Sequence, residues 1–216
     1  MHILIGYISI YGYIAIVLFS ALVIKKRFNT SDETSRKIVH IFISFTWLIM
    51  IYFFNGTIHM LIPGLTFIIL NYISYKKGIL SMIERDDQNE QSLGTVYYAC
   101  SIFIFSLLTL LNEQFLIPST IGLFCMALGD GLAPFFGKRY SFIKLYNKKT
   151  ISGGISVFLL SVFVILVIER FTNVNFSILG VILIAISSSL LEIISKKGLD
   201  NLILPIGVMI VSYLLM

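Results

Sequence analysis

Apolar stretches alternate with short polar and basic loops along the whole length of this 216-residue chain. Most of the stretches approach the 20 or so residues that a helix needs to cross the apolar core of a bilayer. They predict helices over residues 3–24, 38–54, 58–75, 95–111, 117–137, 153–169, 177–195 and 201–215, the last of which is short. We therefore expect an all-α integral membrane protein, a polytopic bundle of about eight transmembrane helices that forms a single domain over residues 1–216.

Composition supports this class of protein. Hydrophobic residues make up 57% of the chain and the mean hydropathy is +0.94, which is typical of a membrane-embedded chain rather than a soluble domain. No basic residue precedes the first apolar run, and Lys25-Lys26-Arg27 ends it, so we interpret it as a retained spanning helix and not a signal peptide. Cys100 and Cys125 lack metal-ligand spacing and are expected in the core.

The basic residues occur in alternate loops. Of the 16 lysines and arginines, only Arg170 falls in an even-numbered loop. The positive-inside rule therefore puts the odd-numbered loops in the cytoplasm and both termini on the non-cytoplasmic side. Because the basic residues flank apolar helices, the net charge of +5 does not indicate a nucleic-acid partner. The unusual polar residues gather near these cytoplasmic loops: Arg36, Lys37, His40, Glu90, Gly94, Asp130, Glu192, Asp200 and Asn201. A site built from them would face the cytoplasm.

Asp130 is a carboxylate inside the apolar stretch 117–137. An acid in a membrane helix is costly and is a functional-site hypothesis that needs a partner, such as a metal ion or a cationic side chain. Pro134 lacks an N–H, so the carbonyl of residue 130 loses its helical partner and the helix should bend. Gly129 and Gly131 leave room for a ligand or another backbone beside the acid. Oxygen ligands of this kind suit Mg²⁺.

A second polar segment follows closely and favours anions. Thr150 and Ser152 are good helix caps, and Gly153 opens the next apolar stretch with Lys148 and Lys149 alongside. The N-terminus of a capped helix binds anions. A cation site and an anion site within residues 127–154 would suit a magnesium-phosphate ligand, which phosphoryl transfer needs. The alternative is that the Gly-Asp-Gly sequence and the basic loop serve only packing and topology.

Five motifs follow one another in order along the chain. They are Arg36-Lys-Ile-Val-His40, Glu90 with Gly94-Thr-Val-Tyr-Tyr98, Gly129-Asp-Gly with Gly137-Lys138, Lys149-Thr-Ile-Ser-Gly153, and Glu192 with Asp200-Asn-Leu-Ile-Leu-Pro205. Together they resemble the phytol kinase and dolichol kinase family over residues 36 to 205. This family comprises polytopic membrane enzymes that phosphorylate long-chain lipid alcohols, typically with CTP, and it is related to CTP-dependent diacylglycerol kinases and, more distantly, to phosphatidate cytidylyltransferases.

The resemblance implies which residues hold the nucleotide and its metal: Gly129, Asp130, Gly131, Lys138, Lys149, Thr150 and Gly153. Arg36, Lys37, His40, Glu90, Glu192, Asp200 and Asn201 match the family's other shared positions. Ser152 stands where dolichol kinases and cytidylyltransferases commonly carry a glutamate. This departure looks more like the phytol and farnesol kinase branch.

The sequence therefore predicts a lipid-alcohol kinase that transfers the γ-phosphoryl group of CTP, or another nucleoside triphosphate, to an isoprenoid alcohol such as phytol, farnesol, geranylgeraniol or a polyprenol. Asp130 and Asp200 are the predicted Mg²⁺ ligands, and Asp130, Lys149 and His40 the predicted catalytic residues. Lys138, Lys148 and the start of the following helix would neutralise the phosphates. The expected partners are the nucleotide, the lipid alcohol and membrane lipids.

Two other functions fit part of this pattern. One is a CTP-dependent diacylglycerol kinase or a phosphatidate cytidylyltransferase, which differ from the predicted enzyme in lipid or product. The other is a small ion-coupled transporter in which Asp130 binds a proton or sodium ion, although transporters more often place their site at the membrane midplane. Single residues also have simpler interpretations, since Glu192 stands one turn before Lys196 and could pair with it.

Overall fold

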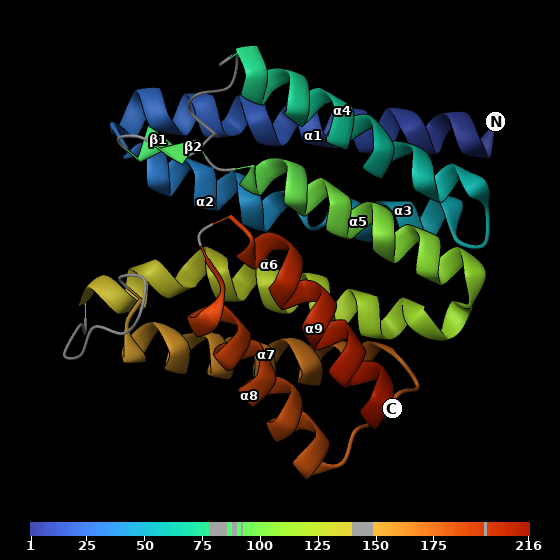
Figure 1. Cartoon of the computed structure of the whole chain (residues 1–216). Coiled ribbons are helices and arrows are strands. Elements are labelled where there is room, and N and C mark those ends of the chain that lie inside the picture. Colours follow the sequence, from blue (N-terminus) through green and yellow to red (C-terminus); the bar gives the residue numbers. More distant parts are fainter. Residues whose placement is uncertain (78–85, 88–89, 92, 140–148, 197) are drawn as a thin grey trace. The chain divides into compact units, whose positions relative to one another are not determined.

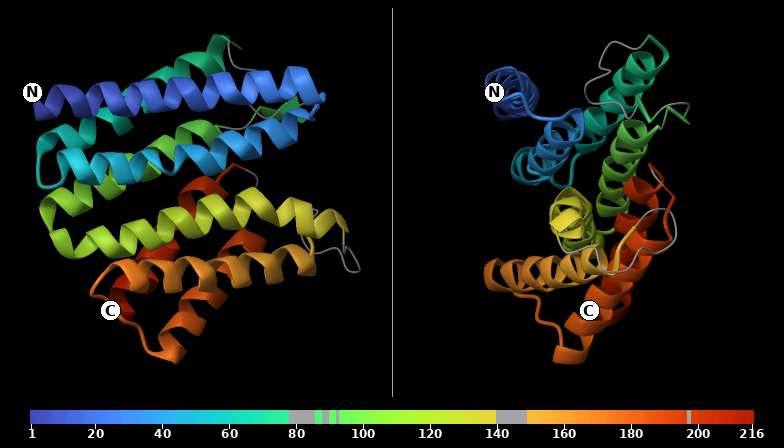
Figure 2. Two further views of the ribbon diagram at one scale, coloured as in Figure 1. Left: turned by 180° about the vertical axis from the view of Figure 1, so that it is seen from behind. Right: turned by 90° about the vertical axis from the view of Figure 1, so that its left-hand side faces the viewer.

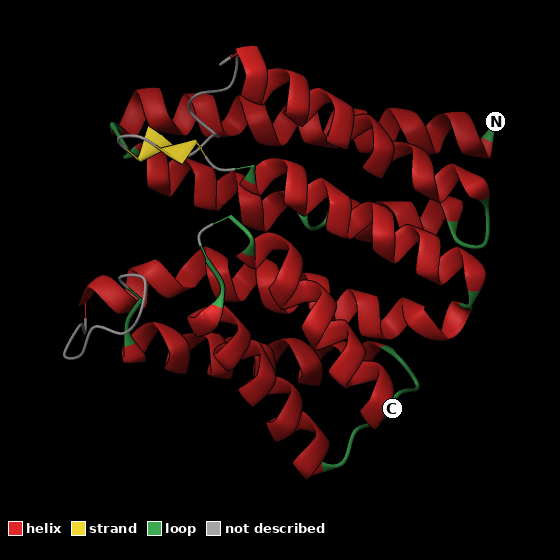
Figure 3. Cartoon of the chain, in the orientation of Figure 1, coloured by secondary structure: helices red, strands yellow, loops and turns green. Residues whose placement is uncertain are grey.

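The computed structural model describes residues 1–77, 86–87, 90–91, 93–139, 149–196 and 198–216. These residues are almost entirely helical, as the helix ribbons in Figure 3 show. The chain divides into two compact units, Met1–Glu113 and Gln114–Met216 (Figures 1 and 2).

The part of unit 1 that the structure describes forms five α-helices. They are α1 (His2–Phe28), α2 (Asp32–Ile43), α3 (Thr46–Phe54), α4 (Leu61–Lys77) and α5 (Gly94–Leu111). A 3-10 turn, η1 (Ile58–Met60), leads into α4, and the two-residue strands β1 (Asp86–Asp87) and β2 (Glu90–Gln91) pair antiparallel before α5. A second 3-10 turn, η2 (Glu113–Phe115), spans the boundary between the two units in the sequence.

The described residues of unit 2 form four α-helices. They are α6 (Leu116–Arg139), α7 (Ile151–Phe171), α8 (Ile178–Ile194) and α9 (Asp200–Leu215). Helix α6 packs on both α7 and α9, and α8 packs on α7 and α9. The end of α6, the start of α7, the end of α8 and the start of α9 carry the candidate site described below.

Helix forms at each of the eight apolar stretches that the sequence predicts, so the all-α class is confirmed. Among the described residues, six helical stretches are long and apolar enough to span a membrane: His2–Phe28, Asp32–Phe54, Ile58–Lys77, Gly94–Leu111, Glu113–Ala133 and Ile151–Phe171. Helices α8 and α9 are apolar but shorter, with 17 and 16 residues. The described helices are thus those of a membrane protein. That the chain crosses the membrane eight times, with both termini on the non-cytoplasmic side, stays a prediction.

The second predicted helix differs from its expected form in two ways. It begins at Asp32, six residues before the predicted start, because Ser31 caps it by accepting a hydrogen bond from the Thr34 amide at 3.2 Å. It is also broken between α2 and α3. There the Ser44 hydroxyl donates to the carbonyl of Ile41, and the backbone tightens into a turn between Phe42 and Phe45. Side-chain bonds of this kind compete with the helical ladder.

Glycines allow close helix packing in unit 2. A Cβ atom on Gly122 would collide with the Pro205 carbonyl oxygen, and one on Gly207 would lie 2.5 Å from Leu191 Cδ1. These contacts bring α6 against α9 and α9 against α8. The Ser161 hydroxyl donates to Ser188 at 2.8 Å and links α7 to α8. Small residues and hydroxyls of this kind are typical of helix interfaces in membranes.

Candidate functional site

Three carboxyl groups from three different helices meet inside unit 2. Asp130 lies on α6, Glu192 near the end of α8, and Asp200 is the first residue of α9. One carboxylate oxygen from each lies within 4.8 Å of the other two, and all three residues are buried. Like charges at this distance in a poorly solvated place repel one another strongly, so the cluster favours the binding of cations.

Lys149 supplies one cation to this cluster. Its Nζ lies 2.8 Å from Glu192 Oε1 and 3.8 Å from Asp200 Oδ2, and it also donates to the backbone carbonyl of Glu192. The side chains of Lys149, Glu192 and Asp200 are 15%, 8% and 6% exposed. Lys149, which precedes α7, is therefore held by residues of α8 and α9, with its ammonium directed at the carboxylates.

The cluster has the donors that a hard divalent cation prefers. Three carboxyl groups bring their oxygen atoms together here, and oxygen atoms are the usual ligands of Mg²⁺. Glu192 Oε2 is buried and has no hydrogen-bond partner among the described residues. A buried carboxylate oxygen without a donor is costly unless a cation meets it. The described residues Asp130, Glu192 and Asp200 thus fit a magnesium site.

A glycine turn positions Asp200 beside Glu192. Gly198 has a φ of 87°, in the left-handed region that favours glycine. The Asp200 amide donates to the Lys196 carbonyl at 3.2 Å, and α9 begins there. Asp200 Oδ1 accepts a hydrogen bond from the Asn201 amide at 3.1 Å, which fixes the carboxylate at the positive end of the helix. The other oxygen, Oδ2, faces Lys149.

The start of α7 is capped as the sequence predicts. Thr150 Oγ1 accepts a hydrogen bond from the Gly153 amide at 3.1 Å, and the Thr150 carbonyl accepts one from the Gly154 amide at 3.1 Å. Ser152 is not itself the cap: it lies in the first turn of α7 and donates to Thr150 Oγ1 at 3.2 Å. The capped start of α7 directly follows Lys149 in the sequence.

Gly129, directly before Asp130, lies where two helices pack closely. A Cβ atom on Gly129 would lie 3.1 Å from Val157 Cγ1 of α7, so this glycine brings α6 close to α7. Gly153 is also tightly enclosed, since its Cβ would lie 3.1 Å from Thr150 Oγ1. Gly131 is buried in α6, and the helix continues through Pro134 to Arg139.

A second group of predicted residues meets in unit 1. The His40 ring of α2 packs edge-on against the Tyr98 ring of α5, with centroids 4.8 Å apart, and the Tyr98 hydroxyl donates to the His40 carbonyl at 3.3 Å. The first two sequence motifs therefore contact each other. Lys37, on the same helix, is only 1% exposed, and Gly94 begins α5. Arg36 lies on α2 and Glu90 in β2.

The chain is similar to the phytol kinase of Synechocystis sp. The two sequences are 29% identical, and the matched region covers 93% of this chain and 87% of that protein. This similarity supports a relationship with phytol kinases, and it extends across both units. No protein-family model matches the chain, and no solved structure matches it.

The predicted site residues of unit 2 lie together to a large extent. Asp130, Lys149, Glu192 and Asp200 form one cluster, with Thr150 and Asn201 next to two of its members. For Lys138 the structure describes the backbone, which is part of α6, and not the side chain. Lys148 lies outside the described residues. Among the described residues, the ion pair of Glu192 is with Lys149 and not with Lys196, the partner in the simpler interpretation. The sequence did not indicate that Glu192 is the third carboxylate, although it is an acid in an apolar stretch like Asp130.

Proposed function

We propose that this chain is a membrane lipid-alcohol kinase. It would transfer the γ-phosphoryl group of CTP, or another nucleoside triphosphate, to the hydroxyl of an isoprenoid alcohol such as phytol, farnesol, geranylgeraniol or a polyprenol. The observation that carries the proposal is the buried cluster of Asp130, Glu192 and Asp200 with Lys149 among its oxygens. The similarity to a phytol kinase along most of both chains supports the same conclusion.

Magnesium is the proposed cofactor. Asp130, Glu192 and Asp200 would hold it, because their carboxylate oxygens converge from three helices and Glu192 Oε2 has no donor among the described residues. Bound there, the metal supplies positive charge to the phosphates of the nucleotide. The sequence predicted Asp130 and Asp200 for this role, and the geometry adds Glu192.

The start of α7 is the proposed phosphate site. Thr150 caps the helix, so its first amides and its dipole favour an anion in front of them. Lys149 is the residue before the cap, and its ammonium would neutralise an oxygen of the β- or γ-phosphate. Lys138, Lys148, Ser152 and the buried glycines Gly129, Gly131 and Gly153 complete the proposed nucleotide region at 127–154.

The proposed reaction is an in-line displacement. The oxygen of the lipid hydroxyl forms a bond to the γ-phosphorus while the bond from that phosphorus to the bridging oxygen breaks, and the nucleoside diphosphate leaves with the bonding electrons. The hydroxyl proton passes to a carboxylate, for which Asp130 is the candidate. Lys149 and the start of α7 would hold the phosphoryl oxygens in place, so that the chemistry depends mainly on position and charge.

We also propose a functional role for a group of residues in unit 1. His40 packs against the Tyr98 ring, and we propose it as a catalytic residue. The proposed set of functional residues in unit 1 also includes Arg36, Lys37, Glu90 and Gly94. The distribution of basic residues supports an active site that faces the cytoplasm, with both termini on the other side.

Products of a labelled assay test the proposal. Purified protein in lipid is incubated with Mg²⁺ and γ-labelled CTP or ATP against farnesol, geranylgeraniol, phytol, a polyprenol and diacylglycerol, and products are identified by mass. A labelled isoprenyl monophosphate is the expected result. A CDP-lipid made from phosphatidate would replace the proposal with a cytidylyltransferase. Uptake of an ion into vesicles that depends on Asp130, without nucleotide chemistry, would replace it with a transporter.

A further inference from the structure

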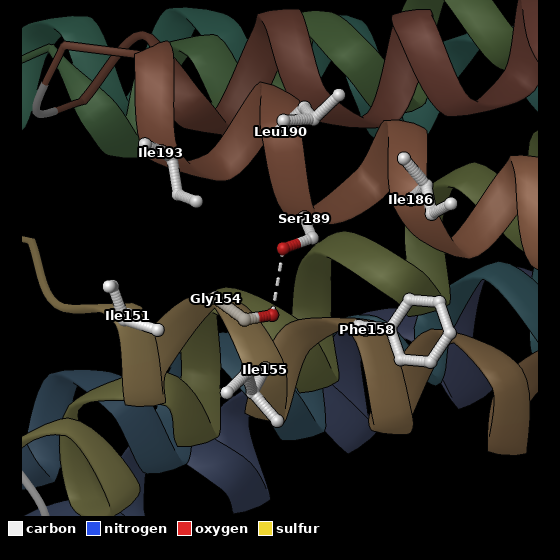
Figure 4. A pocket seen from close by; sticks show the side chains of 8 residues that line it. All are labelled: Ile151, Gly154, Ile155, Phe158, Ile186, Ser189, Leu190 and Ile193. Carbon is white, nitrogen blue, oxygen red and sulfur yellow. Dashed lines mark hydrogen bonds between the residues drawn. The ribbon is translucent and has the colours of Figure 1, made fainter.

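An apolar groove runs between α7 and α8 in unit 2. Its cavity volume is about 290 Å³. Three side chains from each helix form its walls: Ile151, Ile155 and Phe158 from α7, and Ile186, Leu190 and Ile193 from α8 (Figure 4). The groove is open toward the outside of the unit, since Ile155 and Leu190 are each 55% exposed.

The polar atoms in the groove satisfy each other. The Ser189 hydroxyl donates to the Gly154 carbonyl at 2.8 Å, as the dashed line in Figure 4 shows. A Cβ atom on Gly154 would lie 2.9 Å from Ile193 Cδ1 and 3.2 Å from Ser189 Oγ, so glycine is needed for the helices to approach this closely. Because donor and acceptor are paired, the groove offers its occupant a surface of methyl groups and one aromatic ring.

One end of the groove adjoins the carboxylate cluster. Ile151 follows Lys149 by two residues and Ile193 directly follows Glu192, and these two ionic residues are 2.8 Å apart. Ile151 and Ile193 lie at one end of the groove, and Phe158 and Ile186 at the other (Figure 4). The helical rise between residues 151 and 158 gives the groove a length of about 10 Å. An amphiphile in it would have its polar end at the cluster and its tail along the helices.

We propose that this groove binds the hydroxyl-proximal part of a single isoprenoid tail, an inference that rests on the proposed kinase function. Small-molecule sites commonly have volumes of about 300 to 1,000 Å³, so a groove at the lower limit holds one branched segment and not the paired chains of diacylglycerol. The rest of the tail passes the open side into the bilayer lipids. The enzyme therefore selects the branching near the hydroxyl and tolerates different tail lengths.

Two tryptophan variants test the groove in the intact protein. Ile155→Trp fills the groove, and Leu166→Trp is the control. Leu166 lies three turns further along the same face of α7, is 53% exposed and does not line the groove. We expect Ile155→Trp to raise the KM for geranylgeraniol about tenfold, with the KM for the nucleotide unchanged. Leu166→Trp should behave like the wild type. Equal KM values for geranylgeraniol in both variants would overturn the proposal while leaving the kinase activity established.

Photocrosslinking gives a readout that does not need turnover. A farnesol analogue with a diazirine near the hydroxyl is irradiated with wild-type protein in lipid vesicles, and the labelled peptides are identified by mass. Labelling within residues 151–158 and 186–193 that unlabelled farnesol suppresses is the expected result. Labelling that an excess of unlabelled phospholipid suppresses equally would show that the groove holds ordinary bilayer chains and would overturn the proposal. Selective labelling without any phosphoryl transfer would support the lipid groove and contradict the proposed kinase function.

Discussion

The ammonium of Lys149 lies 2.8 Å from the carboxylate of Glu192, although 43 positions separate the two residues in the sequence. This contact joins the start of α7 to the end of α8 and is largely buried. A buried ion pair loses much of its hydration, so each partner depends on the other for its charge. The pair therefore connects the predicted phosphate site to the predicted metal ligands.

Replacing Lys149 with methionine should destabilise the protein as well as inactivate it. The change leaves Glu192, Asp130 and Asp200 close together without this ammonium, and breaking a buried pair costs about 3 to 5 kcal/mol. We expect a lower thermal midpoint in detergent and no detectable turnover. Lys196→Met is the control, since Lys196 is exposed beyond the end of α8. Equal midpoints for the two variants would contradict a structural role for the pair.

Magnesium should stabilise the folded protein before any substrate is added. A ligand that binds only the folded state raises the free energy of unfolding by about 2.7 kcal/mol when it is present at about 100 times its Kd. Thermal unfolding of the wild type at increasing Mg²⁺ should show a rising midpoint, and Asp200→Asn should abolish the rise. Asp32→Asn should keep it, because Asp32 is an exposed carboxylate that pairs with Lys25. A rise in midpoint that persists in Asp200→Asn would place magnesium elsewhere.

Gly122 tests the close packing that holds the site together. Alanine at this position would drive its Cβ into the Pro205 carbonyl and push α6 from α9, which carry Asp130 and Asp200. Overpacking of this kind costs about 1 to 3 kcal/mol, so unfolding in denaturant should begin earlier. Gly12→Ala in α1 is the matched change, because nothing lies within 4 Å of its Cβ position. It should be neutral or slightly stabilising.

The positions of the helices could be predicted because each apolar stretch is long and its ends carry polar residues. The break at Ser44 and Phe45 could not, since it depends on a hydroxyl that bonds to the Ile41 carbonyl and on local backbone geometry. Nothing in the hydrophobic pattern of residues 38–54 marks that turn.

The candidate site was partly predictable for a similar reason. Asp130 is conspicuous as an acid in an apolar stretch, and Thr150 as a residue that caps a helix. The alternative pairing of Glu192 with Lys196 came from helical spacing, which considers only neighbours along the chain. Tertiary packing of α7 against α8 and α9 brings Lys149 to Glu192 instead. The convergence of three carboxylates is likewise a property of the folded unit.

The most direct test of the account compares wild-type protein with Asp130→Asn, which keeps the shape of the side chain and removes its charge. Each is incubated in lipid with Mg²⁺, γ-labelled CTP and geranylgeraniol, with folding verified by gel filtration and thermal unfolding. We predict labelled geranylgeranyl monophosphate from the wild type and a loss of at least about 100-fold in the variant. Unchanged turnover in folded Asp130→Asn protein would contradict the assignment of the carboxylate cluster as the phosphoryl-transfer site.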